Sequence, residues 1–225
     1  VEGLLGAAAA ELSMGTFHGI CARILRRDGQ EIGLPNDFVI YARDDQLALV
    51  RRIEVTQHID PKRFAPGAIL SAISSAKNEQ RNAASYQQDV SSYFEEIVGR
   101  VFEDYERALE RSAAVDFDDL LGKVALLFQM RPEVRERYAE RYLHTLIDEF
   151  QDTNIVQYEL ARAWASVHGN ITAVGDPDQS IYSWRAADIR NLTNFQRHFE
   201  NTEVVLLEQN YRSSGHILTA ASAVI

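Results

Sequence analysis

The sequence has a single cysteine, no long apolar run and no excess of basic residues, and each shortage excludes a class of protein. Cys21 has no second cysteine to pair with in the chain, so a reducing cytoplasm fits the sequence. The longest apolar stretches, such as residues 124–128, fall far short of the roughly 20 residues that span a bilayer, so we expect no membrane segment. The start of the chain also lacks the basic and apolar regions of a secretory signal.

The charge balance is acidic. The chain has 23 Lys and Arg against 33 Asp and Glu, a net charge of −10 with His neutral. This argues against a protein that coats nucleic acid by bulk charge, but it leaves room for a local site built from a few residues. The 225 residues are 46% hydrophobic and 25% charged, which is ordinary for a globular protein and gives no support to a disordered or collagen-like chain. A chain of this length buries roughly 70% of its unfolded surface, enough for one large core or two modest ones.

Two changes of pattern divide the chain. Apolar residues recur every three or four positions through residues 44–114, which predicts a wholly helical stretch. Asp116 is the expected N-cap of a further helix that ends at Arg131-Pro132, and residues 158–167 are another helix candidate. Three short apolar runs, each followed by polar residues, are expected to be buried strands of a parallel sheet: residues 143–147, 171–174 and 204–207. The order of strand, helix and strand predicts an α/β doubly wound core.

Polar residues at the carboxyl ends of these strands are the first candidates for function, because parallel sheets bind ligands there. Asp148 and Glu149 follow the first run, and two adjacent carboxylates suit a nucleotide hydrolase. One carboxylate would hold Mg²⁺ and the other would orient or deprotonate the attacking water. The alternative is a strand that simply ends in acidic loop residues. Asn154 and Gln157 resemble a capping box, and we interpret both as caps of the next helix.

Aromatic and basic residues follow the second and third runs. Tyr182 and Trp184 are two positions apart, so in an extended segment they point the same way, with Arg185 beside them. Such a group forms a stacking platform for single-stranded bases, worth about 1–3 kcal/mol per base, although Trp184 packed in the core is the alternative. Arg212, at the expected junction of the third strand and a helix, is placed to contact a phosphate. Taken alone, such an Arg is more often a surface salt-bridge partner.

Five blocks resemble, in order and spacing, the UvrD/PcrA/Rep family of superfamily 1 DNA helicases. They are Thr16-Phe17-His18-Gly19 with residues 21–26, residues 116–121, 148–154, 175–185 and Asn210-Tyr211-Arg212-Ser213. The resemblance covers nearly the whole chain. It implies the parallel sheet of a RecA-like P-loop NTPase, without its P-loop strand, carrying an all-helical inserted subdomain. Residues 1–43 and 115–208 would form the ATPase domain, 44–114 the insert, and 209–225 the start of a second RecA-like domain.

The same resemblance implies the roles of the site residues, with ATP and Mg²⁺ as cofactors. Asp148 would coordinate Mg²⁺, Glu149 would be the catalytic base, and Gln179 would sense the γ-phosphate. Tyr211 would stack on adenine, and Arg212 would reach the γ-phosphate as an arginine finger. The residues implied to contact single-stranded DNA are Thr16, Phe17, His18, Tyr182, Trp184 and Arg185. Next to them, Gly19 stands where the family commonly has Ser.

The resemblance also implies that the insert meets duplex junctions. Its candidate phosphate contacts are Arg51, Arg52, Lys62, Arg63, Lys77 and Arg81, which otherwise form a solvated helix face. Asp116 with Asp119 makes an N-terminal cap, so a structural interpretation of the block 116–121 stands beside a functional one.

The phosphate-cradling loop G-x-x-x-x-G-K-[S/T] does not occur in the sequence. In the family this loop precedes the Thr16 block. The chain, which opens on Val1 and closes on Ile225, therefore resembles an internal piece of a helicase that translocates on single-stranded DNA and unwinds duplex in repair or replication. The piece alone is expected to lack ATPase activity.

Two alternatives from other classes stay open. One is a Mg²⁺-dependent nuclease in which Asp116, Asp118 and Asp119 gather with the Asp148-Glu149 pair. The other is a non-catalytic module that binds single strands or docks a partner, with the aromatic residues but no ATPase.

Overall fold

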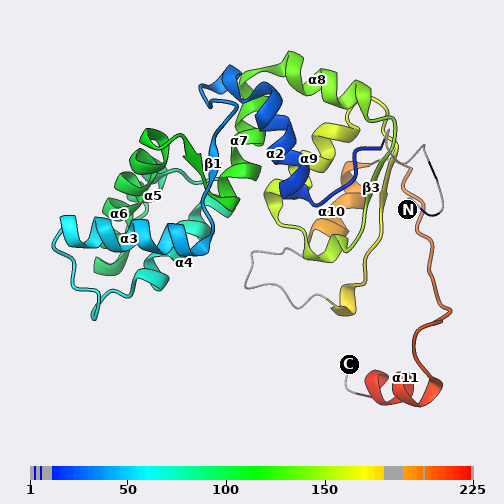
Figure 1. Cartoon of the computed structure of the whole chain (residues 1–225). Coiled ribbons are helices and arrows are strands. Elements are labelled where there is room, and N and C mark those ends of the chain that lie inside the picture. The colour runs from blue at the N-terminus through cyan, green and yellow to red at the C-terminus, as the bar shows by residue number, and fades with distance from the viewer. Residues whose placement is uncertain (1–2, 4–5, 7–11, 180–189, 200, 224–225) are drawn as a thin grey trace.

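The computed structural model describes residues 3, 6, 12–179, 190–199 and 201–223. Helices dominate this part of the chain, and four short strands accompany them (Figure 1). The helices are α2 Phe17–Asp28, α3 Arg43–Thr56, α4 Pro66–Asn78, α5 Ala83–Gln88, α6 Tyr93–Arg111, α7 Phe117–Met130, α8 Pro132–Arg141, α9 Ile155–Ala165, α10 Arg190–His198 and α11 Gly215–Ser222. The strands are β1 Val39–Ile40, β2 Ala114–Val115, β3 Thr145–Ile147 and β4 Ile171–Ala173. Within the described ranges, no helix combines the length and apolar character needed to cross a membrane.

The strands pair into two small parallel sheets, β1 with β2 and β3 with β4. In the second sheet Ile147 lies opposite Ala173, and the pairing continues because the Val174 N–H donates to the Ile147 carbonyl at 2.8 Å. The helix α9 connects β3 to β4, so the predicted parallel strand, helix, strand unit is confirmed. The strands are shorter than predicted and less covered, since Leu146 is 76% exposed while Ile147 is buried. The loops that follow β3 and β4 leave the sheet at the same edge.

The prediction of a third buried strand is wrong. Residues 202–210 are not a strand, and the side chains of residues 204–207 are 60% to 85% exposed. A strand forms only where a neighbour accepts its backbone hydrogen bonds and covers one face. In the described part of the chain this segment has no such neighbour, and it runs away from β3 and β4 toward α11 (Figure 1). An apolar run indicates that a segment favours burial. It does not show whether a neighbouring strand is present for the segment to pair with.

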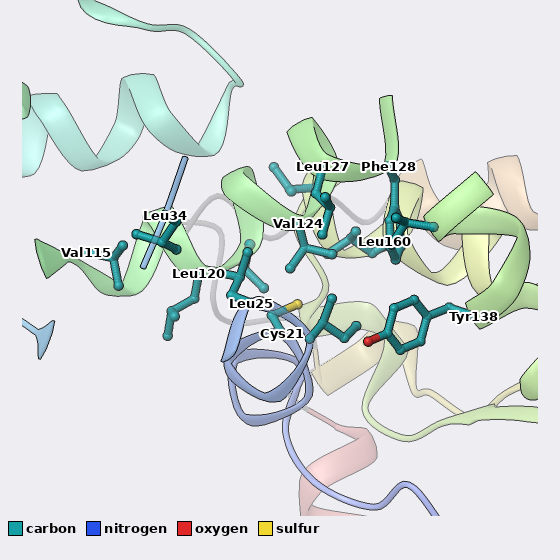
Figure 2. Close-up of a cluster of buried hydrophobic side chains, with 14 of the residues drawn as sticks. Cys21, Leu25, Leu34, Val115, Leu120, Val124, Leu127, Phe128, Tyr138 and Leu160 are labelled. Carbon is teal, nitrogen blue, oxygen red and sulfur yellow. The ribbon is translucent and has the colours of Figure 1, made fainter. Parts of the chain in front are cut away.

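One hydrophobic cluster is formed by α2, α7, α8 and α9. In α7, Leu120, Val124, Leu127 and Phe128 recur at helical spacing and are all buried. Figure 2 shows them facing side chains of α2, α8 and α9 around Cys21. Burying each Leu or Phe contributes about 1.5–3 kcal/mol relative to leaving it exposed. We call this group the α7 cluster; its labelled members in Figure 2 are Cys21, Leu25, Leu34, Val115, Leu120, Val124, Leu127, Phe128, Tyr138 and Leu160.

A second cluster lies among α3, α4 and α6, on the other side of β1 and α7 (Figure 1). We call it the α6 cluster; its members include Leu49, Val50, Ile53, Ile69, Leu70, Ile73, Ile97, Val98, Val101, Phe102 and Tyr105. Between residues 43 and 111 the structure has helices joined by turns and short irregular segments, and no strand, which confirms the helical prediction as far as Arg111. Ala114, its predicted last residue, belongs to β2 instead.

The predicted helix caps are confirmed, although α9, Ile155–Ala165, begins and ends earlier than the predicted helix 158–167. The Asp116 carboxylate accepts the Asp119 N–H at 2.8 Å, and Asp119 accepts the Asp116 N–H at 3.1 Å, so the two close a capping box on α7. Asn154 and Gln157 do the same for α9, with both hydrogen bonds at 2.9 Å. As predicted, α7 ends before Pro132, where α8 begins.

Candidate active site

The two carboxylates predicted to act in hydrolysis lie directly after β3. Asp148 and Glu149 are both exposed, and the Glu149 N–H donates to Asp148 Oδ1 at 3.0 Å. Glu149 has φ 51° and ψ 46°, a left-handed conformation that costs a non-glycine residue about 1–3 kcal/mol. This turn sends the next side chain, Phe150, into the interior, where it is 0% exposed. The carboxylate of Glu149 therefore stays at the surface while the chain beside it is anchored.

That anchor is a third apolar cluster beneath the loop. Phe150 packs edge-on against Phe195 and Tyr158, with ring centroids 5.5 Å and 5.9 Å away. The far end of the loop is tied down as well, because Asn191 Nδ2 donates to the Thr153 carbonyl at 2.9 Å. Between the two anchored residues, Phe150 and Thr153, burial raises the pKa of Asp152, and the charge of Glu149 raises that pKa further. The acidic loop is thus held from α10 as well as from α9.

A second polar loop follows β4, beginning at Gly175. The Asp176 carboxylate organises it: Oδ1 accepts the Asp178 N–H at 3.0 Å, and Oδ2 accepts Gln179 Nε2 at 2.6 Å. A single turn of 3-10 helix, Pro177–Gln179, closes the loop. The predicted sensor Gln179 is therefore positioned by Asp176.

Gln151 joins the two loops. Its side chain is 1% exposed, Nε2 donates to Glu149 Oε2 at 2.7 Å, and Oε1 accepts the Asp176 N–H at 3.0 Å. The structure thus brings together Glu149 and Gln179, two predicted site residues, through two residues to which the sequence assigned no role. The sequence signal for this link was a glutamine between acidic residues in a short loop. Such a pattern does not reveal a contact with a residue 25 positions away.

Asp148 fits a Mg²⁺ site of the kind that nucleotide hydrolases use. Among the residues that the structure describes, no three His, Cys, Asp or Glu side chains come close enough to form a metal cage. Mg²⁺ at nucleotide sites is usually held by one or two carboxylates, the remaining ligands being water and substrate phosphates. The exposed carboxylate of Asp148, beside that of Glu149, matches this open arrangement.

The start of α2 lies next to Asp148. A cavity of about 430 Å³ is lined by Thr16, Phe17 and His18 on one side and by Asp148 and Gln157 on another. Thr16 caps α2, its Oγ1 accepting the Gly19 N–H at 3.2 Å. Phe17 stacks on Trp164 with ring centroids 5.7 Å apart, and burial lowers the pKa of His18. These three predicted DNA contacts therefore share a cavity with the predicted Mg²⁺ ligand.

Tyr211 and Arg212, two further predicted site residues, are not brought into this group. Tyr211 is 92% exposed, and Arg212 is exposed beside it in the turn before α11. Asn210 Oδ1 shapes that turn by accepting the N–H groups of Arg212 and Ser213 at 2.9 Å and 2.8 Å. Neither the Tyr211 nor the Arg212 side chain forms a hydrogen bond or ion pair with the described residues of either loop. Three further predicted residues lie outside the described residues: Tyr182, Trp184 and Arg185.

Comparison with known proteins gives the family. The model of the UvrD/REP helicase N-terminal domain matches residues 1–200. The chain belongs to the UvrD/REP helicase family. It is 43% identical over its 225 residues to the ATP-dependent DNA helicase PcrA of Bacillus subtilis, and 42% identical to PcrA of Staphylococcus aureus. The chain spans 30% and 31% of the length of these two relatives.

In this UvrD/REP family chain, the basic residues predicted to contact DNA phosphates divide into two groups. Arg51, Arg52, Lys62 and Arg63 are exposed. Lys77 is not, since its side chain is 8% exposed and its Nζ lies within 3 Å of three carboxylates, at 2.6 Å from Glu106, 2.7 Å from Asp116 and 2.9 Å from Asp119. The prediction that Lys77 contacts phosphate is wrong, because its ammonium is buried and paired with these carboxylates. Arg81 is partly exposed and pairs with Asp89 at 2.9 Å.

The same contacts show a structural role for the block 116–121. Asp116 and Asp119 cap α7 and bind Lys77. Asp118 accepts Asn78 Nδ2 at 2.9 Å, and burial, with the charge of Asp116, raises its pKa. The gathering of these acids with Asp148 and Glu149 that a two-metal nuclease needs is not found in the described part of the chain. The nuclease alternative therefore has no support in this fold.

Proposed function

We propose that the chain is the part of an ATP-dependent DNA helicase that supplies the carboxylates for ATP hydrolysis and part of the surface for single-stranded DNA. One observation carries the proposal: Glu149, at the end of β3, is linked through Gln151 and Asp176 to Gln179, after β4. The names of the relatives, both ATP-dependent DNA helicases, support it. The parent protein would translocate along single-stranded DNA and unwind duplex, in repair or replication.

The proposed domain organisation follows the family pattern. Residues 1–43 and 115–208 belong to a RecA-like P-loop NTPase domain, and 209–225 begin a second one. Residues 44–114 form an all-helical insert on the first domain. The parallel β3–α9–β4 unit supports the first assignment, and the separate α6 cluster supports the insert.

In the proposed mechanism Asp148 holds Mg²⁺, and Glu149 orients the attacking water and takes its proton. When bound, Mg²⁺ and ATP supply the reacting phosphoryl group and the charge that stabilises it in transfer. Gln179 faces the γ-phosphate from the second loop. Tyr211 stacks on the adenine and Arg212 approaches the γ-phosphate, which requires the segment before α11 to lie closer to the acidic loop than it does here. The chain by itself does not hydrolyse ATP, because its sequence lacks the phosphate-cradling loop.

DNA binding is proposed at two places. Thr16, Phe17 and His18 contact the single strand beside the hydrolytic site, a proposal supported by the cavity that they share with Asp148. Tyr182, Trp184 and Arg185 complete the single-strand surface. The phosphates of duplex junctions are contacted by exposed basic residues of the insert, namely Arg51, Arg52, Lys62 and Arg63.

The test is ATP hydrolysis with and without single-stranded DNA, on the chain extended through its natural flanking sequence. We expect DNA to stimulate hydrolysis, and Glu149→Gln to lower kcat about 10²–10⁴-fold, as loss of a general base does. Glu136→Gln, an exposed residue of α8, is the matched control and keeps full activity. An extended protein that binds single-stranded DNA but hydrolyses no ATP would refute the proposal and favour a non-catalytic binding module.

A further inference from the structure

Among the residues that the structure describes, Gln151 is the one whose side chain bonds to both loops of the site. It is buried, yet it belongs to none of the three hydrophobic clusters and caps no helix. Both ends of its amide are used, Nε2 on Glu149 Oε2 at 2.7 Å and Oε1 on the Asp176 N–H at 3.0 Å. A buried amide bonded at both ends holds its partners at a fixed separation.

Chemistry fixes the orientation of this amide. A backbone N–H can only donate, so the group that faces Asp176 must be the oxygen of Gln151. An ionised carboxylate can only accept, so the group that faces Glu149 must be the nitrogen. Rotating the amide by half a turn would oppose donor to donor and acceptor to acceptor, and both hydrogen bonds would be lost. Gln151 therefore has a single orientation that satisfies both loops.

Gly175 makes the contact possible. A Cβ built on Gly175 would lie 2.7 Å from Gln151 Oε1 and 3.3 Å from the Gln151 backbone nitrogen. The first distance is shorter than a carbon and an oxygen tolerate, and the amide has no free space to move into because it is 1% exposed. Any side chain at position 175 would thus push the two loops apart.

Beyond Asp176 the linkage continues to the proposed phosphate sensor. The carboxylate of Asp176 accepts Gln179 Nε2 at 2.6 Å, so three hydrogen bonds in series connect Glu149 with Gln179. The residues at the two ends are 30 positions apart in sequence and follow different strands. Each bond is directional, so displacing one end alone stretches or breaks a bond.

We propose that Gln151 is a positioning residue, whose buried amide fixes the Glu149 carboxylate relative to the loop of Asp176 and Gln179. It touches neither nucleotide nor water in this role and acts through the two groups that it holds. The inference rests on the proposed function, because the roles of Glu149 and Gln179 in ATP hydrolysis come from there.

The experiment compares Gln151→Met with the wild-type natural protein that carries this chain. Met has a similar volume and no hydrogen-bonding amide, so the variant removes both bonds without leaving a cavity. We expect kcat for DNA-stimulated ATP hydrolysis to fall about 10–100-fold while KM for ATP changes little, because orientation is lost and nucleotide contacts are not. Gln129→Met, at an exposed position of α7, is the matched control and leaves both constants unchanged.

Hydrogen exchange provides a readout that does not depend on activity. The Asp176 N–H is bonded to Gln151, so Gln151→Met should speed its exchange about tenfold or more while amides of α9 exchange as before. Gly175→Ala disrupts the same contact from the other loop, so it should also lower kcat and speed exchange of the Asp176 N–H. If Gln151→Met does not fold, as a lost melting transition would reveal, Gly175→Ala carries the test.

The outcomes separate the inference from the proposed function. Unchanged kcat in a Gln151→Met variant of an active protein overturns the inference alone. A fall in kcat with unchanged exchange at Asp176 also overturns it, because the loss would then not come from the link. A wild-type protein that hydrolyses no ATP overturns the proposed function and the catalytic purpose of Gln151 with it, and exchange at Asp176 still reports whether the amide holds the loops together.

Discussion

At the scale of single residues, neighbours decide what a charged side chain does. Burial alone would lower the pKa of Lys77, but the carboxylates of Asp119, Asp116 and Glu106 hold it well above its usual value. The Tyr105 hydroxyl donates to Asp116 at 3.0 Å in the same group, and burial raises the pKa of that hydroxyl. Lys77 is therefore a permanently charged structural residue, although in the sequence it looks like any other helix lysine.

We predict that Lys77→Met lowers the free energy of unfolding by about 3–5 kcal/mol, the usual cost of removing one partner from a buried ionic group. The reason is that Asp116 and Asp119 stay buried without a cation. Because the folded pKa of Lys77 is raised, its stabilisation is complete below the unfolded pKa and is lost only as the pH rises through the folded one. The deficit of the variant should thus be the same at pH 6 and pH 8.

Urea unfolding measures this effect, and Lys62→Met is the control. Lys62 is exposed and has no ion pair in the described part of the chain, so its replacement should cost at most about 0.5 kcal/mol. A loss of less than 1 kcal/mol for Lys77→Met would mean that the three acids are neutral or solvated in the folded protein.

The sequence predicted residues of the site whose neighbours are local and missed those whose neighbours are distant. Asp148 and Glu149 were placed correctly, because a strand end can be recognised from a few adjacent residues. The bond from Gln151 to Asp176 spans 25 positions, and the bond from Lys77 to Asp116 spans 39. Spacing along one element cannot reveal such contacts, so the first was missed and the second made the prediction for Lys77 wrong.

At the scale of elements, the same rule separates helices from strands. Helix starts were predictable because caps act over three residues, as Asn154 and Gln157 do at α9. Strands need a partner from elsewhere in the chain. The pair β1 and β2, two residues each, left no periodic signal, and the apolar run of residues 204–207 was wrongly predicted as a strand.

Two asparagine caps allow a test of what one helix start contributes to the fold. Asn82 caps α5 at an exposed position, where its Oδ1 accepts the Ser85 N–H at 2.8 Å. Asn154 caps α9 in the same way, but it is 6% exposed and its Nδ2 also donates to Asn78 Oδ1 at 2.6 Å. Asn154 thereby ties α9 to α4, while Asn82 serves its own helix.

We predict that Asn82→Ala costs about 1 kcal/mol, the usual value of an N-cap. Asn154→Ala should cost about 2–4 kcal/mol, because it loses a cap and also leaves a partly buried acceptor on Asn78 unpaired, worth about 1–3 kcal/mol more. Urea unfolding of the two variants side by side measures the difference. Equal losses would show that the bond from Asn154 to Asn78 adds nothing to stability.

At the scale of the whole molecule, the two hydrophobic clusters are joined by polar bridges. Asp116 caps α7 and binds Lys77 of α4 and Tyr105 of α6. Asn78 of α4 bonds to Asp118 and Asn154. Figure 1 shows α7 standing between α3–α6 and the β3–β4 sheet. Pulling the α6 cluster away from the α7 cluster would expose an ammonium and several carboxylates that now satisfy one another.

We therefore predict that the two clusters unfold together. Hydrogen exchange pulse-labelling along a urea series should give the same midpoint for the amides of α6 and those of α9, because neither half keeps its buried charges paired without the other. In Lys77→Met the bridge is broken, and the α6 midpoint should fall below that of α9, whereas Lys62→Met should keep the two together. Separate midpoints in the wild-type protein would mean that each cluster is stable alone and that the buried ionic group between them transmits no cooperativity.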